Sequence, residues 1–321
     1  MNPKQGQKEF FSVVVPIYNE EKIIPVLFRR ITETMRPLGD YEIIAVDDGS
    51  CDGTAGELHR HARADQRIKQ IRLSRNFGHQ AAISAGLDAA RGSAVIIIDG
   101  DLQDPPEVIP QMIDQWRKGH QVVYAVRRKR KEGILKRLAY KAFYLLMRAV
   151  TPFPVPLDSG DFSLIDRNVL DQIVRLPEKT RFIRGLRAWV GFSQIGVEYE
   201  RQGRAHGLPK YTLQKLIGLG RNGIVAFSGL PLRISLLAGV FMCLAALLAA
   251  LFLVLLKITF HPQVPVGWFS LAVGLLFFAG LQFLFLGIIG EYLSLVLDEV
   301  QRRPTYIVEE KTNFRILGTS R

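Results

Sequence analysis

Two carboxylates directly follow an apolar run in the first third of the chain. The run 94–98 (Ala-Val-Ile-Ile-Ile) has the composition of a buried strand, and Asp99 and Asp101 come next with one glycine between them. Ligands of open α/β sheets bind at the carboxyl ends of the strands. Carboxylates with this spacing can both approach one hard divalent cation, such as Mg2+ or Mn2+. We therefore expect Asp99 and Asp101 to hold a metal on the phosphates of a substrate.

A structural role accounts for the acidic residues that come next. Asp104 is a typical N-cap residue, and the sequence Pro105–Glu107 suits the first turn of a helix. An acidic turn of this kind is the alternative to a metal site. It explains Asp104 well, but it does not explain Asp99 or Asp101.

Acidic residues also follow two earlier strands. The strand predicted over 12–16 leads to Glu20, and the strand predicted over 41–46 leads to Asp47. Carboxylates at these strand ends can accept hydrogen bonds from the base and the ribose hydroxyls of a nucleoside. Together with a metal that neutralises a diphosphate, they favour a nucleotide substrate.

The elements that position these acids alternate along the chain. Strands are predicted over 12–16, 41–46, 68–73, 94–98 and 122–126, with a helix between each pair. This order predicts right-handed crossovers and a Rossmann-like α/β layer with a mostly parallel sheet. Neither Gly-x-Gly-x-x-Gly nor a P-loop follows a strand, so dinucleotide oxidoreduction and P-loop hydrolysis lose their main support.

Two long apolar runs lie near the end of the chain. The segments Ile234–Leu256 and Ile258–Gly290 contain no Asp, Glu, Lys or Arg. At about 1.5 Å per residue, each can cross a hydrocarbon core of roughly 30 Å. We expect two transmembrane helices, over about 232–256 and 267–290, in an α/β protein; buried core helices are the alternative.

The distribution of charge predicts the orientation in the membrane. The net charge is +12, with Arg233 just before the first run and Arg302 and Arg303 just after the second, while the loop between the runs carries only Lys257. The positive-inside tendency places the N-terminal region and the C-terminal tail in the cytoplasm of a multi-pass inner (cell) membrane protein. Two cysteines are too few for a disulfide framework, which agrees with a reducing compartment.

A basic run at 127–131 follows the strand predicted over 122–126. No aromatic stacking platform accompanies it, so the run does not indicate nucleic acid. Arg127 leaves the strand at the ligand edge, where it can bind a phosphate; the residues after it can equally form a solvated loop. Basic amphipathic segments over about 134–150 and 208–230 predict interfacial helices on an anionic leaflet, with packing on the sheet as the alternative.

Nine ordered motifs resemble the family 2 glycosyltransferases of GT-A fold, specifically the polyprenyl-phosphate glycosyltransferases. This group includes the dolichol-phosphate mannosyltransferase and bacterial undecaprenyl-phosphate glucosyltransferase types. The motifs are Pro16-x-Tyr18-Asn19-Glu20, Val46-Asp47-Asp48-Gly49-Ser50-x-Asp52-x-Thr54, Arg75-Asn76-Phe77-Gly78, Asp99 to Glu107, Gly160-Asp161-Phe162, Arg181 to Leu186, Arg201-x-x-Arg204-x-x-Gly207-x-x-Lys210-Tyr211, Gly290 to Leu293 and Arg303-Pro304-x-Tyr306-Ile307-Val308.

The resemblance implies an activity and its partners. It implies a metal-dependent, inverting transfer of a sugar, a hexose by family habit, from a nucleotide diphosphate sugar to a polyprenyl phosphate on the cytoplasmic leaflet. The family favours a UDP-sugar as donor and Mg2+ or Mn2+ as cofactor. Related proteins are often tetramers, so a homo-oligomer is implied as well.

Roles for individual residues follow from the same resemblance. Asp161 takes the base-like position, with Asp101 the second catalytic candidate. An orienting role for Asp161 stays open, because the second pKa of a phosphate monoester is about 6 and the acceptor needs no base. The other implied positions are Asp99, Asp101 and Gln103 for the metal; Pro16, Tyr18, Glu20, Asp47, Asp99, Arg204 and Lys210 for the donor; and Arg127 and Arg137 for the acceptor phosphate.

These expectations divide the chain into four parts. They are a cytoplasmic GT-A domain over 1–207, a juxtamembrane interfacial helix over 208–230, two transmembrane helices within 231–297 and a cytoplasmic tail over 298–321. A processive polysaccharide synthase would normally carry Gln-x-x-Arg-Trp and more spans, and neither is found. A non-catalytic membrane scaffold that binds sugar nucleotides would be expected to have lost Asp99 or Asp101, and both are present.

Overall fold

The computed structural model describes residues 9–127, 159–179, 181–200 and 267–314, together with scattered helical residues between 232 and 259. The chain forms two compact units, which are described separately below. The first comprises Met1–Arg148, Pro152–Thr212 and Arg303–Arg321, and the second Ala149–Thr151 and Leu213–Arg302. The interfacial helices predicted over 134–150 and 208–230 lie outside the described residues.

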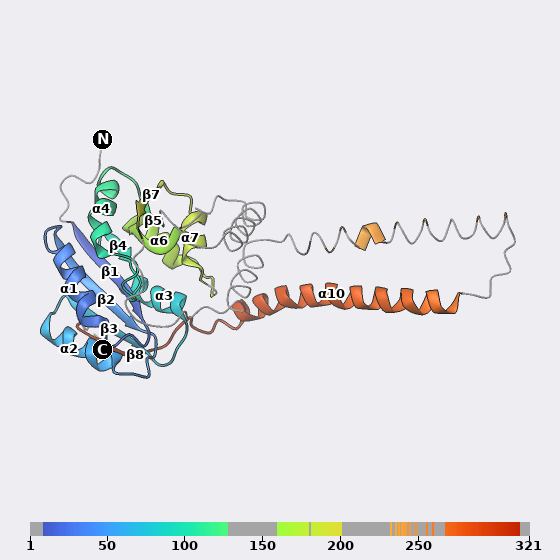
Figure 1. The fold of residues 1–321 in the computed structure, drawn as a ribbon, viewed down its shortest axis with the longest axis horizontal. Coiled ribbons are helices and arrows are strands. Elements are labelled where there is room, and N and C mark those ends of the chain that lie inside the picture. Colours follow the sequence, from blue (N-terminus) through green and yellow to red (C-terminus); the bar gives the residue numbers. More distant parts are fainter. Residues whose placement is uncertain are drawn as a thin grey trace, which may run out of the picture. The chain divides into compact units, whose positions relative to one another are not determined.

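The first unit is built on one eight-stranded sheet with the strand order β7-β5-β6-β4-β1-β2-β3-β8 (Figure 1). The strands are β1 (Phe10–Ile17), β2 (Asp40–Asp47), β3 (Ile68–Leu73), β4 (Ala94–Ile97), β5 (Val122–Arg127), β6 (Ser159–Asp166), β7 (Gln194–Tyr199) and β8 (Val308–Thr312). The centre β4-β1-β2-β3 is parallel throughout, as the alternation of strands and helices predicts.

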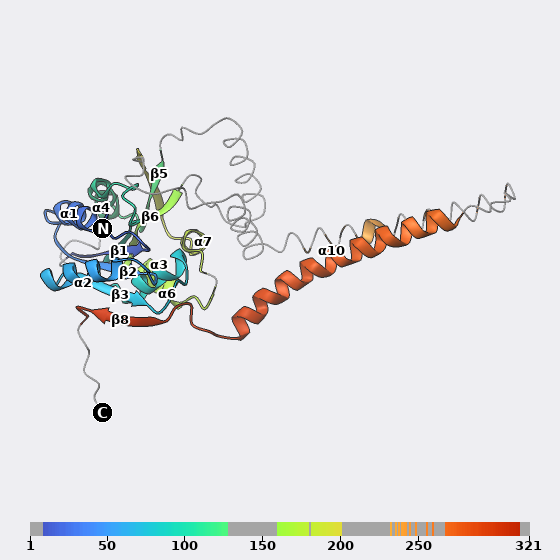
Figure 2. The same cartoon turned by 60° about the horizontal axis from the view of Figure 1, so that its bottom comes forward.

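Helices cover both faces of this sheet (Figure 2). The helical segments of the unit are α1 (Ile24–Met35), α2 (Thr54–Ala64), α3 (His79–Ala89), the 3-10 turn η1 (Pro106–Val108), α4 (Ile109–Arg117), α6 (Arg167–Arg175) and α7 (Ile183–Trp189). Helices α1, α2 and α4 share one hydrophobic core on one face. Helix α3 packs on the other face against β1 and β2, next to α6.

The strand β6 is the main departure from the predicted parallel sheet. It lies between β4 and β5 and is antiparallel to both, although β4 and β5 are separated by only one helix in the chain. The sequence of β6, Ser-Gly-Asp-Phe-Ser-Leu-Ile-Asp, carries polar residues that do not alternate regularly with apolar ones, so periodicity alone does not predict it. Its insertion is what brings Asp161 into the centre of the sheet.

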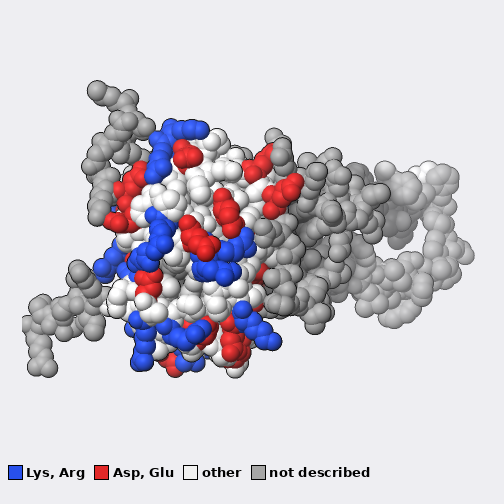
Figure 3. Space-filling view, turned by 60° about the vertical axis from the view of Figure 1, so that its left-hand side comes forward, with Lys and Arg blue, Asp and Glu red and all other residues white. Residues whose placement is uncertain are grey.

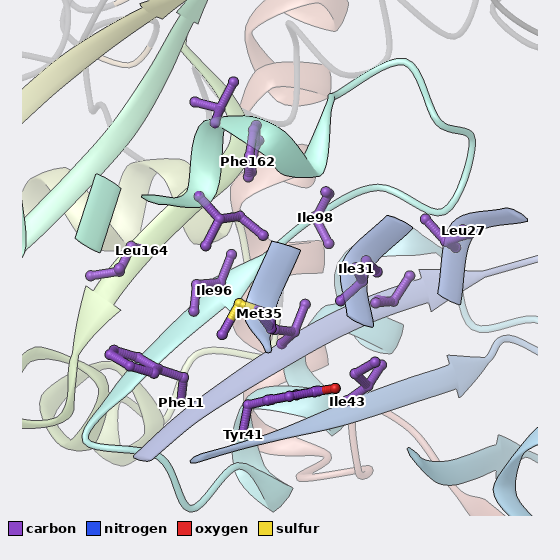
Figure 4. Packing of buried hydrophobic residues seen from close by; sticks show 14 of the residues in the cluster. Phe11, Leu27, Ile31, Met35, Tyr41, Ile43, Ile96, Ile98, Phe162 and Leu164 are labelled. Atoms are coloured by element: carbon purple, nitrogen blue, oxygen red, sulfur yellow. The ribbon is translucent and has the colours of Figure 1, made fainter. Parts of the chain in front are cut away.

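The core between the sheet and α1 is made of aliphatic and aromatic side chains, with the hydroxyl of Tyr41 among them (Figure 4). Helix α1 buries Ile24, Leu27, Phe28, Ile31 and Met35, which recur at the three- and four-residue spacing of one helix face. Each such side chain contributes about 1.5–3 kcal/mol when it is fully removed from water. This face therefore fixes α1 on the sheet.

Helix α3 approaches the opposite face closely. A Cβ atom at Gly86 would lie 2.3 Å from Cγ1 of Val14 on β1, so only glycine permits this approach without a shift. The neighbouring Ala82 and Ala85 are also buried. Small residues thus hold α3 tightly on the sheet, and the helix begins at the ligand edge with His79.

Basic and acidic side chains are interspersed on the face of the first unit that Figure 3 presents. The net charge of +12 does not gather there into one basic surface. Mixed charges of this kind are typical of a solvated protein surface.

The C-terminal tail completes the sheet of the first unit. The strand β8 pairs antiparallel with β3 of the same chain. Asn313 then donates its side-chain amide to the carbonyls of Ala62 and Ile68. Earlier in the tail, the hydroxyl of Tyr306 lies 2.7 Å from Oδ2 of Asp88, the residue before the last of α3.

The second unit contains the helix α10 (Trp268–Val300). Its segment Phe277–Val300 is long and apolar enough to cross a membrane by length and composition, and no other helix within the described residues meets these criteria. The helix extends beyond the end predicted at 290, because apolar residues such as Leu293 and Leu297 continue at helical spacing. The first predicted span, 232–256, lies largely outside the described residues, so two spans are not confirmed.

We predict that the side-chain amide of Asn313 measurably stabilises the first unit. We expect Asn313→Ala to lower the free energy of unfolding by about 1–3 kcal/mol, because two carbonyls lose their donor. Asn313 has a φ of 63°, which alanine adopts poorly, so Asn313→Gly separates the lost hydrogen bonds from the backbone effect. Thermal unfolding in detergent would measure both variants.

The control for this prediction is Glu310→Ala. Glu310 is half-exposed and lies 3.8 Å from His59, a contact of the kind that contributes little. If Asn313→Ala and Glu310→Ala melted at the same temperature, the tail would not be held by Asn313.

Candidate functional site

Strand ends from distant parts of the chain meet at the carboxyl edge of the parallel strands. Ile97 on β4 is opposite Ser163 on β6. Because the two strands are antiparallel, two further residues along this register place Asp99 opposite Asp161. The predicted metal-side acid and the predicted base-like acid are therefore neighbours at one edge of the sheet.

One imidazole joins these two acids. Nε2 of His79, the first residue of α3, lies 3.4 Å from Oδ1 of Asp99 and 3.4 Å from Oδ2 of Asp161. Burial disfavours the charged imidazole, but Asp161 and Asp99 outweigh burial and raise the pKa of His79 to about 9. His79 therefore carries a positive charge between the two carboxylates at neutral pH.

Asp161 is held on both carboxylate oxygens. Arg184 on α7 contacts Oδ1 through Nε at 2.8 Å and Oδ2 through Nη2 at 3.2 Å, and Nε2 of Gln80 donates to Oδ2 at 3.2 Å. Burial favours the neutral acid, yet Arg184 and His79 outweigh burial and hold the pKa of Asp161 well below its ordinary value. Asp161 is therefore a buried aspartate in a salt bridge with Arg184.

The helices that carry these donors are linked to each other. Oε1 of Gln80 accepts the backbone N–H of Ile183 at 3.0 Å, while its amide nitrogen donates to Asp161. One side chain of α3 thereby fixes both the first turn of α7 and the carboxylate on β6. The position of Arg184 depends on this link.

The acids of the predicted metal site differ in their surroundings. Oδ1 of Asp99 is buried and accepts no hydrogen bond, and burial raises the pKa of Asp99 to about 6. Oδ1 of Asp101 accepts the backbone N–H of Gln103 at 3.1 Å, which closes the loop after β4. Within the described residues, no group of three His, Cys, Asp or Glu side chains converges as a metal site.

Asp104 does not cap the helix that follows it. The cap position of η1 is Pro105, with no side-chain hydrogen bond, whereas Asp104 is fully buried and accepts a hydrogen bond from the hydroxyl of Tyr199. Nε of Arg127 donates to the same hydroxyl at 3.2 Å. The carboxylate, the phenol and the guanidinium thus form one chain of contacts that connects the loop after β4 with β7 and the end of β5.

The predicted nucleoside residues lie at the ends of β1 and β2. Pro16 is buried on β1, Tyr18 and Glu20 are half-buried after it, and Asp47 is buried at the end of β2. Oδ1 of Asp47 accepts the backbone N–H of Ser50 at 2.9 Å.

Asp48 positions the loop that precedes α3. Its carboxylate accepts the backbone N–H groups of Phe77, at 2.7 Å, and of Gly78, at 3.0 Å. Gly78 has a φ of 100° and directly precedes His79. Asp48 therefore fixes the backbone position of His79, even though Asp48 and His79 are far apart in sequence.

A second arginine of α7 is buried without a hydrogen-bond partner among the described residues. The side chain of Arg187 is fully buried, and its three nitrogens make no hydrogen bond within the described part of the chain. Its guanidinium lies 5.4 Å from the ring centroid of Tyr124, and burial lowers the pKa of Arg187 to about 10. The part of the site next to Asp161 thus carries more positive than negative charge, because Arg184 and Arg187 both lie beside one carboxylate.

Other predicted site residues lie outside the described part of the chain. These are Arg137, Arg204 and Lys210. Asp99, Asp101 and Gln103 lie in the loop after β4 and Arg127 ends β5, as the rule of strand ends predicts, whereas Asp161 lies near the amino end of the antiparallel strand β6, which that rule does not predict.

Sequence reasoning missed His79, Gln80 and Tyr199 and gave Arg184 little weight. His79 and Gln80 directly follow the Arg75–Gly78 motif at the carboxyl end of β3, and this position could have revealed them. Tyr199 had no comparable signal, because β7 joins the sheet only through β5.

Comparison with known proteins shows the family of this chain. The family model described as "Glycosyl transferase family 2" matches residues 12–174, which include most of β1, the strands β2 to β6 and most of α6. The chain belongs to glycosyl transferase family 2. The match contains Asp47, Asp99 and Asp161, so the acids of the site lie within the family domain of this glycosyltransferase.

Relatives extend the similarity over nearly the whole of this family 2 glycosyltransferase. The uncharacterized glycosyltransferase YkcC of Bacillus subtilis (strain 168) is 46% identical over 94% of this chain and 93% of its own. The bactoprenol glucosyl transferase of Shigella phage SfII is 38% identical over 93% of this chain and 97% of its own.

Among solved structures, the mannosyl-3-phosphoglycerate synthase of Rubrobacter xylanophilus overlaps with 70% of this glycosyltransferase and 74% of its own chain. The identity is 23% and the TM-score 0.48. An overlap of this size is too low to transfer substrates or site residues.

We predict that removal of the buried Tyr199 hydroxyl lowers the stability of this glycosyltransferase. We expect Tyr199→Phe to lower the free energy of unfolding by about 1–3 kcal/mol, since Asp104 and Arg127 lose a buried hydrogen-bonding partner. Tyr124→Phe is the matched control, because the Tyr124 hydroxyl makes no hydrogen bond within the described residues. Thermal unfolding compares them, and equal melting temperatures would refute a stabilising role for the Tyr199 hydroxyl.

Proposed function

We propose that this glycosyltransferase transfers a hexose from a nucleotide diphosphate sugar to a polyprenyl phosphate, with inversion, on the cytoplasmic leaflet. The observation that carries the proposal is the convergence of Asp99 and Asp161 on Nε2 of His79 at the ligand edge of the sheet. Bactoprenol is a polyprenol, and relatives 38% identical are named as bactoprenol glucosyl transferases. A UDP-sugar is the donor that the family resemblance favours.

The bond changes of this reaction need no proton acceptor from the protein. An oxygen of the acceptor phosphate forms a bond to the anomeric carbon, and the bond from that carbon to the β-phosphate oxygen breaks, releasing nucleoside diphosphate. A phosphate monoester has a second pKa of about 6, so its nucleophilic oxygen is already ionised at neutral pH. Asp161 then orients neighbouring side chains that donate hydrogen bonds, and it accepts no proton from the acceptor phosphate. This role fits the pKa of Asp161, which lies below its ordinary value.

Asp99, Asp101 and Gln103 are the residues that would hold Mg2+ or Mn2+. The buried oxygen of Asp99 that lacks a hydrogen bond fits a hard cation, and the donor set of carboxylate and amide oxygens fits it as well. When bound, such a cation offsets the negative charge of the diphosphate leaving group.

The nucleoside would lie against the ends of β1 and β2. Pro16 and Tyr18 shape the base pocket, and Glu20 and Asp47 face the base and the ribose hydroxyls. Arg204 and Lys210 bind the donor diphosphate in this proposal, and Arg127 and Arg137 bind the acceptor phosphate. Arg127 is held by Tyr199 at the end of β5, which pre-orients its guanidinium at the site.

The proposal also includes the arrangement in the membrane. The GT-A domain over 1–207 and the tail over 298–321 lie in the cytoplasm, with an interfacial helix over 208–230 and two spans within 231–297. The apolar segment Phe277–Val300 supports one of these spans. We further propose a homo-oligomer, a tetramer by resemblance.

The experiment is transfer by the purified protein in detergent or nanodiscs. Labelled UDP-glucose, polyprenyl phosphate and Mn2+ are combined, and lipid-linked sugar and free nucleoside diphosphate are measured. The proposal predicts one sugar per lipid, and release of nucleoside diphosphate only when lipid and metal are both present. A polymeric product would indicate a processive synthase, and no transfer from any nucleotide sugar would indicate a binding scaffold.

Asp99→Asn and Asp101→Asn test the metal assignment. Both variants should abolish transfer and metal-dependent binding of UDP, because a hard cation loses an anionic ligand, while the protein stays folded. Titration calorimetry with and without Mn2+ measures the binding. Asp114→Asn, on the exposed side of α4, is the matched control, and near-native turnover of either site variant at limiting Mn2+ would disprove the assignment.

The raised pKa of Asp99 predicts how metal affinity depends on pH. Burial raises the pKa of Asp99 to about 6 in the metal-free protein, and a cation binds the ionised carboxylate. Below this pH the cation must displace a proton, so we expect Mn2+ affinity to fall by up to tenfold per pH unit and to level off above about pH 7. An affinity that is constant from about pH 5 to pH 7 would contradict this expectation.

Arg137→Ala and Lys210→Ala test the division of phosphate binding. Arg137→Ala should raise the KM for polyprenyl phosphate, and Lys210→Ala the KM for the nucleotide sugar, each about tenfold for roughly 1.4 kcal/mol of lost charge-assisted binding. Steady-state kinetics with each substrate varied in turn would separate the two effects. Equal effects of both variants on both substrates would refute the division.

A further inference from the structure

His79 has a position that none of the assigned roles uses. Its Nε2 is within 3.4 Å of both Asp99 and Asp161, so the same nitrogen faces the metal-side and the acceptor-side carboxylates. The other ring nitrogen, Nδ1, lies on the opposite side of the imidazole and makes no hydrogen bond or ion pair within the described residues. The ring is therefore held by one nitrogen and offers the other.

The imidazole is also the most accessible part of this cluster. The His79 side chain is 40% exposed, against 24% for Asp99 and 4% for Asp161. A ligand that enters from solvent reaches His79 before it reaches the carboxylate of Asp161. His79 thus lies where a substrate group would meet the cluster.

The charges around His79 favour an anion on the Asp161 side. Arg184 and Arg187 carry two positive charges beside the single carboxylate of Asp161, while Asp99, Asp101 and Asp104 lie toward the acidic loop. A divalent cation on the acidic side would offset the donor diphosphate. The acceptor phosphate carries about −1.5 to −2 charges at neutral pH and needs cations of its own.

We propose that His79 is a substrate-binding residue of this glycosyltransferase, which donates a hydrogen bond from Nδ1 to the phosphate of the polyprenyl acceptor. This inference rests on the function proposed above and adds a residue to its acceptor site. Asp161 holds Nε2, so its role is to orient the imidazole. The loop fixed by Asp48 sets the start of α3, so the ring is placed before the acceptor arrives, which lowers the entropic cost of binding.

Two substitutions of His79 separate its charge from its shape. His79→Gln keeps a polar side chain but removes the cation, and His79→Lys keeps a cation. We expect His79→Gln to raise the KM for polyprenyl phosphate about tenfold, as for the loss of one charge-assisted hydrogen bond, and His79→Lys to recover most of that loss. The Kd for UDP with Mn2+, measured without acceptor, should stay within about twofold of the wild type in both variants.

His120→Gln is the matched control for this experiment. His120 lies in the turn before β5, at the amino edge of the sheet and away from the ligand edge. Its KM values for both substrates should equal those of the wild type. Thermal unfolding of all three variants shows whether each is folded before its kinetics are compared.

The outcomes distinguish this inference from the proposed function. If the wild type forms no polyprenyl-phosphate sugar, the proposed function fails before His79 is tested. If the wild type is active and His79→Gln changes only the KM for the nucleotide sugar, or changes neither KM, the assignment of His79 to the acceptor phosphate is wrong. A weaker Kd for UDP in His79→Gln would place the imidazole on the donor and would overturn it equally.

Discussion

The arrangement of the site depends on one buried carboxylate. Asp161 is almost inaccessible to water, and it receives Arg184 on both oxygens, Gln80 on one and the imidazole of His79 beside them. A buried charge is tolerated only when it is paired and hydrogen-bonded, so these partners cannot be removed singly without cost. Since they come from α3 and α7, the ionised state of Asp161 holds both helices against β6.

This constraint decides the chemistry that Asp161 can perform. A carboxylate that two cations hold in the ionised form is a weak proton acceptor, and a phosphate acceptor needs none. We therefore infer that the cluster acts through the charged hydrogen-bond donors around Asp161, which are held in fixed directions. Electrostatic stabilisation by such pre-oriented groups is commonly the largest contribution to catalysis. In this family 2 glycosyltransferase, we infer that Asp161 serves by organising cations.

The central strands and several acids of the candidate site were predictable from the sequence. Buried apolar runs give β1 to β5 nearly at their observed bounds, and the strand-end rule identifies Asp47 and Asp99, because both depend on local pattern. The order in which the strands pair was not predictable. The strand β6 lies antiparallel between β4 and β5, and only this topology brings Asp161 opposite Asp99. Asp104 fits the pattern of a helix cap but bonds Tyr199, since burial and a long-range partner outweigh local preference.

The ionisation of Asp161 is the most direct measure of this account. Carbon-13 labelling of aspartate carboxyl groups, with Asp161→Asn to assign the resonance, reports the protonation of that residue by NMR in detergent. We predict that the Asp161 carboxyl shift stays at its ionised value from about pH 5 to pH 9, because Arg184 and His79 hold the pKa of Asp161 well below its ordinary value. A titration of that resonance with a midpoint near neutral pH would contradict it and would restore Asp161 as a proton acceptor.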